Sequence, residues 1–135
     1  MPIMSAFANI DTEFSIKNTH SSYVNHGICS LAFDVQAPDY IPNLREMEFY
    51  ATLVNAKGKE VDHLVSGISE FNEVGGKTYG TFYLESEAAC EVFGERVVFN
   101  KAMVYFTDGS KGEDIIKTKK LILDDFKPVK ISIGK

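Results

Sequence analysis

The side chains best able to do chemistry in this 135-residue chain are three histidines, two cysteines and scattered carboxylates. Hydrolytic catalysis requires a nucleophile, a general base and an orienting acid at one place, and no signature such as G-x-S-x-G marks such a set here. The candidates for an enzyme would be His63, Asp62 and Cys29, because these reactive groups lie beside predicted strands. Since no reactive set converges in the sequence, we predict that the protein is not an enzyme.

Residue spacing gives little support to a metal or phosphate site. His20 and His26 lack the H-x-H or H-x-x-x-H spacing of paired metal ligands. The segment 108–114 gathers oxygen ligands, but Lys111 and two glycines interrupt the EF-hand pattern and favour a plain hairpin turn. The segment 75–78 ends like a P-loop without its first glycine, and a strand follows it. We therefore predict neither a metal nor a cofactor.

The two cysteines indicate the redox compartment. Cys29 lies on the apolar side of an alternating run and is predicted to be a small buried hydrophobe, whereas Cys90 falls in a predicted helix. One disulfide between them is the alternative, but a lone pair without a secretory signal predicts reduced thiols. No basic leader precedes a long apolar run, and no stretch approaches the roughly 20 apolar residues of a membrane helix. These features predict a cytoplasmic location and no membrane partner.

Length and composition predict one globular domain over residues 1–135, because two cores of half this size would each be marginal. The net charge of −5 is unevenly distributed. Residues 1–100 hold 14 acids and 6 bases, whereas residues 101–135 hold 5 acids and 8 bases. An acidic body with a basic end is suited to an acidic partner or to a second copy of the chain, and it disfavours nucleic acid.

Alternation of apolar and polar residues predicts strands at 10–16, 28–35, 47–54, 61–65, 78–84 and 97–107. A turn-rich segment at 18–22 is predicted to end the first strand, and the two prolines of 36–43 predict a loop. Further strands are predicted at 115–123 and near the C-terminal end, at 129–133.

One short helix is predicted at about 86–93, with Ser86 as its cap and Gly94 as its stop. Seven or eight strands with one short helix predict an all-β fold, an immunoglobulin-like antiparallel β-sandwich. The Trp of antibody domains is missing, so this is an analogy at the level of fold.

Aromatic and basic residues give the strongest hints of binding. Tyr79 and Tyr83 are predicted to face outward on one strand, and Lys117, Lys119 and Lys120 are predicted to charge a sheet edge. We therefore predict a non-catalytic module that binds a protein partner, or itself as a homodimer, through a strand edge, this aromatic stripe or loops. The alternative is a small apolar ligand held between the sheets or in a barrel.

Overall fold

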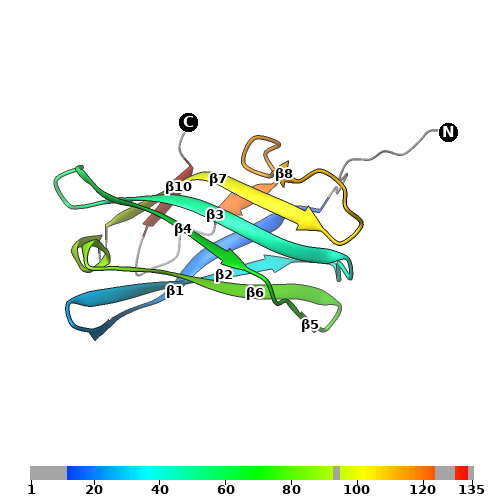
Figure 1. The fold of residues 1–135 in the computed structure, drawn as a ribbon, viewed down its shortest axis with the longest axis horizontal. Coiled ribbons are helices and arrows are strands. Elements are labelled where there is room, and N and C mark those ends of the chain that lie inside the picture. Colours follow the sequence, from blue (N-terminus) through cyan, green and yellow to red (C-terminus); the bar gives the residue numbers. More distant parts are fainter. Residues whose placement is uncertain (1–11, 93–94, 124–129, 134–135) are drawn as a thin grey trace.

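A computed structural model of the chain describes residues 12–92, 95–123 and 130–133. Strands dominate these residues, and they form two stacked sheets (Figure 1). The elements are β1 (Phe14–Asn25), β2 (Ile28–Ala37), β3 (Leu44–Val54), β4 (Glu60–Ile68), β5 (Asn72–Val74), β6 (Lys77–Ser86), a 3-10 helix η1 (Ala88–Val92), β7 (Arg96–Phe106), β8 (Glu113–Asp114), β9 (Leu121–Leu123) and β10 (Lys130–Ile133). No helix among the described residues is long and apolar enough to cross a membrane.

The first sheet has the strand order β5-β6-β2-β1-β9, and the second has the order β10-β7-β3-β4 with β8 paired to β7. Most neighbouring strands are antiparallel, whereas β9 and β10 join the sheet edges in parallel with β1 and β7. The predicted all-β sandwich is confirmed. The long strand predicted at 97–107 is β7, which lies between β10 and β3.

The core between the sheets is built largely from one face of the alternating strands. On β7 strict alternation fails, because a register shift puts Val97 and Phe99 on the same buried face as Ala102 and Val104. The centre of the core is a cluster of four buried phenylalanines, two from each sheet: Phe33 and Phe82 from the first, and Phe49 and Phe99 from the second. Phe82 stacks on Phe49 across the two sheets, with ring centroids 4.3 Å apart. Phe82 also stacks on Phe33 within its own sheet at 5.1 Å. These ring contacts join the two sheets at the centre of the core.

The first strand is longer than the sequence predicted. β1 continues through the turn-rich segment 18–22 and ends at a hairpin whose turn residues, His26 and Gly27, have φ angles of 53° and 80°. A bulge at Asn18 explains why the polar run stays in the strand. The buried Asn18 amide donates to the Ala32 carbonyl at 2.8 Å and to the His20 carbonyl at 3.2 Å, so a polar side chain satisfies the interrupted ladder.

The predicted helix at 86–93 is a single 3-10 segment, η1, and it carries a disulfide. Ser86 caps it by accepting the Ala89 N–H at 3.1 Å, as its position predicted. Cys90 is bonded to Cys29 of β2, so the prediction of reduced thiols is wrong. The cause is tertiary: η1 folds back over the end of β2, which brings together two cysteines 61 residues apart.

The strand predicted at 115–123 is also wrong over most of its length. Residues 115–119 form turns, and only Leu121–Leu123 forms a strand, which pairs in parallel with β1. The buried Ile115 anchors this turn in the core. Short segments such as β5, β8 and β9 raise the count to ten strands in the described chain, above the seven or eight predicted. Gly94, the predicted stop of the short helix, and the start of the strand predicted at 129–133 lie outside the described residues.

Candidate protein interface

The structure does not bring the three candidate catalytic residues together. His63 is exposed on β4 of the second sheet, and Asp62 precedes it on the opposite face of the strand. Cys29 lies in the first sheet, 2% exposed, and its sulfur is consumed in the disulfide. A nucleophile, base and acid at these positions therefore cannot act on one substrate atom.

The carboxylates of the 108–114 loop bond to the protein itself. The Asp108 carboxylate accepts the Ser110 N–H at 2.9 Å, and hydrogen bonds from Ser110 lower the pKa of Asp108. Asp114 accepts the N–H groups of Ala102 and Ile116, both at 3.1 Å. Among the described residues, no group of three or more His, Cys, Asp or Glu side chains is placed to hold a metal ion.

The predicted tyrosine stripe lies on the outer face of the first sheet. Tyr83 is 53% exposed, Tyr79 is half-buried, and Thr81 stands between them. Thr81 donates its hydroxyl to the Asp34 carboxylate of the neighbouring strand at 2.9 Å. The alternation of β6 was therefore predicted correctly, although a polar row separates the two rings.

The predicted lysine edge is a turn and not a strand. Lys117 and Lys119 are exposed within residues 115–119, whereas Lys120 forms a partly buried ion pair with Glu113 at 3.0 Å. β9 begins directly after them, at the edge of the first sheet opposite to β5 and β6. The lysines and the tyrosines are thus three strands apart, roughly 14 Å at ordinary strand spacing, and do not form one patch.

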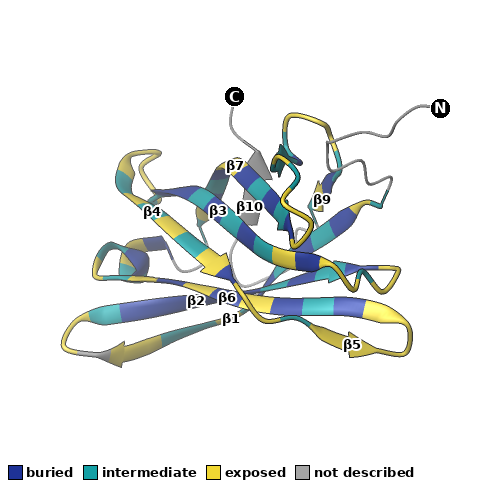
Figure 2. Cartoon of the chain, turned by 45° about the vertical axis from the view of Figure 1, so that its right-hand side comes forward, coloured by how far each residue is buried: buried dark blue, intermediate teal, exposed yellow. Residues whose placement is uncertain are grey.

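β4 is an edge strand of the second sheet. This strand pairs with β3 along Glu60–Ile68, and its C-terminal end comes close to β6 of the first sheet (Figure 2). Its outward residues His63, Val65 and Gly67 are exposed, and Val65 shows 59% of its surface. A long edge without Lys or Pro is a ready template for pairing with another strand.

Two contacts define which backbone groups of β4 face the free edge. Successive residues of an edge strand point their N–H and C=O groups alternately towards the neighbouring strand and away from it. The Met47 carbonyl oxygen points towards β4, because it lies 2.8 Å from where a Cβ atom on Gly67 would stand. Met47 and its partner Ile68 are therefore a hydrogen-bonded pair of the β3–β4 ladder. His63 gives its N–H to the Asp62 carboxylate at 2.8 Å. By alternation, Val65 and Gly67 present their amides to the free edge.

Hydrogen exchange along β4 should show this alternation directly. We expect the amides of Leu64, Ser66 and Ile68 to exchange slowly, because they bond to β3, and those of Val65 and Gly67 to exchange fast. Residue-resolved exchange followed by NMR in deuterated water is the measurement. Equal protection at Val65 and at its two neighbours would contradict the proposed orientation of the edge.

Hydrogen bonds and a cation–ring contact join side chains on the outer face beside β4. The hydroxyls of Tyr50 and Tyr105 both donate to one oxygen of Glu48, at 3.3 and 3.4 Å. The Glu48 charge raises the pKa of Tyr50, and burial followed by that charge raises the pKa of Tyr105. Lys101 lies 5.4 Å from the centroid of the Tyr50 ring. These contacts link the side chains of Glu48, Tyr50, Lys101 and Tyr105 across this face.

A largely apolar hollow of about 410 Å³ opens on this outer face. Its lining includes Tyr50 and Val65, and its polar groups belong to His63, Asn100 and Lys101. The Thr52 hydroxyl accepts the Asn100 amide at 2.8 Å and lies 3.0 Å from Nδ1 of His63, which fixes the imidazole ring. An apolar side chain from a strand added at β4 would have this hollow beside it.

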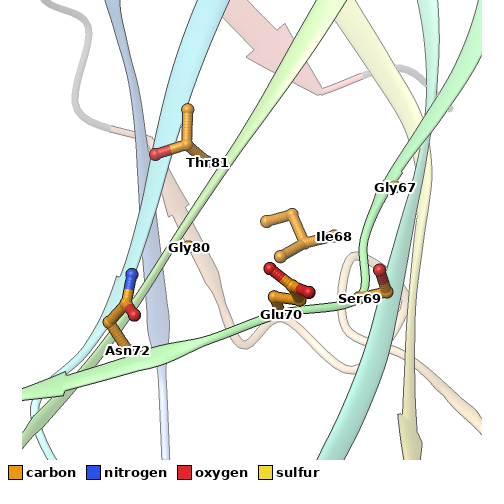
Figure 3. Close-up of a pocket in the computed structure, with 7 residues that line it drawn as sticks. All are labelled: Gly67, Ile68, Ser69, Glu70, Asn72, Gly80 and Thr81. Atoms are coloured by element: carbon orange, nitrogen blue, oxygen red, sulfur yellow. The ribbon is translucent and has the colours of Figure 1, made fainter.

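A second hollow, of about 340 Å³, lies where the chain leaves β4 for the other sheet. Figure 3 shows Glu70 and Asn72 on the departing segment and Thr81 on β6, around Ile68. Gly80 also lines this hollow, and a side chain would not fit there, because a Cβ atom would lie 2.9 Å from an Ile68 carbon and 3.0 Å from a Phe71 carbon. This hollow is polar, and its charged group is the exposed Glu70 carboxylate.

Sequence reasoning named a strand edge without locating it, and it missed Val65, Gly67 and Glu70. A signal was present in the composition: residues 60–76 contain four acids and neither Lys nor Arg. Periodicity alone could not show that this stretch supplies an edge strand to both sheets, since that depends on pairing between distant segments.

Comparison with known proteins supports the fold. No family model matches the chain, and neither does any curated protein sequence. The solved structure of IrmA from Escherichia coli is similar, with a TM-score of 0.68 and 15% sequence identity over 88% of this chain and 97% of that one. At this identity the likeness establishes a shared fold and nothing about activity.

Proposed function

We propose that this protein is a non-catalytic interaction module that binds a partner protein by strand addition at β4. The observation that carries the proposal is the open edge of β4, where Val65 and Gly67 direct their amides away from β3. An added strand gains main-chain hydrogen bonds from such an edge and gains specificity from the side chains on either face. The apolar hollow at Val65 supplies one such specificity site.

The alternative of an apolar ligand between the sheets has less support. Phe33, Phe49, Phe82 and Phe99 occupy the centre of that space, each at most 1% exposed. Their stacked contacts leave the middle of the sandwich filled by the protein's own rings. An interior ligand would have to displace them, at a free-energy cost comparable to that of a large core rearrangement.

The Cys29–Cys90 disulfide supports the inference that the module works in an oxidising compartment. The Cys29–Cys90 bond does not suit the cytoplasmic location predicted from the sequence, because cytosolic reductants keep thiols reduced. We therefore infer that the partner is met outside the cytoplasm.

Site-specific photo-crosslinking tests strand addition. Benzoylphenylalanine replaces His63 in one protein and Ile122, which is 47% exposed on β9, in a control. In native extract, the label at position 63 should give a discrete adduct that Val65→Pro removes and Val65→Ala keeps. The proline removes the edge amide, whereas alanine removes only side-chain atoms.

Three outcomes would overturn the proposal: no adduct from position 63, an adduct that survives Val65→Pro, or the same adduct from position 122. Circular dichroism of Val65→Pro must match that of the unmodified protein, so that loss of the adduct reports on the edge and not on folding. An adduct with twice the mass of the chain would identify the partner as a second copy.

A further inference from the structure

We propose that the segment received by β4 is basic at both ends and neutral at its centre, an inference that rests on strand addition as the proposed function. The sequence around this edge is acidic without compensation. Residues 60–76 form β4, the crossing between the sheets and β5, and their charged side chains other than His63 are all acids: Glu60, Asp62, Glu70 and Glu73. A basic segment is the electrostatic complement of such a surface.

The acids bracket the open part of the edge. The five residues Leu64–Ile68 carry no charge, and Asp62 and Glu70 lie two residues beyond either end. A partner strand paired over this window would therefore bring its central residues against neutral neighbours and its end residues towards carboxylates.

Glu70 is the carboxylate best placed to receive a cation. The other acids have contacts of their own: Asp62 accepts the His63 N–H at 2.8 Å, Glu73 accepts the Gly76 N–H at 2.6 Å, and Glu60 lies 3.6 Å from His63. Glu70 makes no hydrogen bond or ion pair with any described residue. It lies in the polar hollow with the Asn72 amide and the Thr81 hydroxyl, which suits a Lys or Arg head group (Figure 3).

The nearest bases do not neutralise this edge. Lys59 and Lys77 lie just outside the two ends of the acidic stretch. Lys101 reaches from β7 over the Tyr50 ring and lines the hollow at Val65, so it faces the centre of the window and not its acidic ends.

A second copy of the chain fits this edge poorly. Two β4 strands paired antiparallel about Ser66 would set Asp62 of each copy opposite Glu70 of the other. Like charges directly opposite each other destabilise a strand pair. A different chain with a basic, extended segment avoids this repulsion, and so we commit to that class of partner.

Three synthetic peptides test the inference by isothermal titration calorimetry. The probe is Lys-Lys-Val-Thr-Val-Thr-Val-Lys-Lys amide, and the matched controls carry Gln or Glu in place of all four Lys. We expect the Lys peptide to bind roughly 2- to 25-fold more tightly than the Gln peptide, since each exposed ion pair contributes about 1.5- to 5-fold. The Glu peptide should bind more weakly than either, and the Lys advantage should fade at about 1 M salt, where the Debye length is about 3 Å.

Two protein variants separate the inference from the function on which it rests. Glu70→Gln should weaken the Lys peptide by roughly 1.5- to 5-fold and leave the Gln peptide unchanged, whereas Glu13→Gln, at an exposed acid far from β4, should change neither. Equal binding of Lys and Gln peptides, both abolished by Val65→Pro, would overturn the basic partner and leave strand addition intact. Lys-peptide binding that persists in Val65→Pro would overturn strand addition.

Discussion

Removing the disulfide should lower the free energy of unfolding by about 4 kcal/mol in the chain-entropy estimate for its loop. The bond joins Cys29 to Cys90 across 61 residues of sequence, so it restricts a large part of the unfolded chain. Urea unfolding of Cys29→Ala/Cys90→Ala, followed by circular dichroism, measures the loss. Alanine is preferred to serine at position 29, because that side chain is 2% exposed and a hydroxyl there would be buried.

Reduction gives the matching control. A phosphine reductant should destabilise the unmodified protein as much as the double substitution does, and it should leave the double variant unaffected. The dependence of stability on urea should also steepen without the bond, because the unfolded chain becomes less compact. Free thiols in the freshly purified native protein, or a variant as stable as the parent, would contradict the disulfide.

Loss of the disulfide should act on the segment around η1 and not directly on the edge of β4. η1 contributes two fully buried residues, Ala89 and Val92, and the disulfide fixes this segment to the end of β2. The open edge at Val65 lies on β4 of the other sheet. We therefore expect reduction to affect stability more than the pairing geometry of β4, provided that the protein stays folded.

Local patterning was sufficient to predict most of the long strands. On β6, Phe82 and Leu84 are buried while Tyr83 is exposed, as period-two alternation requires. The gap between the strands predicted at 47–54 and 61–65 is a hairpin turn in which Gly58 has a φ angle of 76°, a conformation that glycine adopts readily. These features depend only on neighbours in sequence.

The errors share a physical cause, which is contact between distant segments. The bulge at Asn18 is stabilised by the Ala32 carbonyl, and Cys90 meets Cys29 only because η1 folds over β2. The turn at 115–119 replaces a strand because Ile115 is anchored in the core and the Ile115 N–H bonds to the Ala102 carbonyl at 2.9 Å. None of these partners is near in sequence, so propensity could not find them.

The candidate interface was predictable only in kind. Tyr83 was correctly placed on an outer face, and a strand edge was among the predicted binding modes. The choice of β4 as the open edge required the strand order, because any strand of an antiparallel sheet can in principle be central. The charge pattern of residues 60–76 gains meaning once that order is known.

Truncation of Phe82 should be the most damaging change within the core. Phe82→Ala is expected to lower the free energy of unfolding by about 4 to 5 kcal/mol, at the upper end of buried aromatic truncations. The ring is 1% exposed, stacks on Phe49 of the other sheet at 4.3 Å and on Phe33 at 5.1 Å, so its loss removes contacts within and between the layers. Urea unfolding is again the measurement.

Phe14→Ala is the matched control for this truncation. Phe14 is equally buried, at 1% exposed, yet it has no ring contact with another aromatic residue in the described part of the chain. Its truncation should fall nearer 3 kcal/mol, and the difference reports the stacking contribution of about 0.5 to 1.5 kcal/mol per aromatic pair. A double-mutant cycle between Phe49 and Phe82 should show a coupling of similar size.

The result for Phe82 also bears on the two functions considered for this fold. A large loss of stability means that the space between the sheets is filled by well-packed rings, which favours binding at the outside of the sandwich. A loss below about 1 kcal/mol would mean that the interior already tolerates a void of that size. In that case an apolar ligand between the sheets would become the better proposal, and strand addition at β4 would lose its main structural advantage.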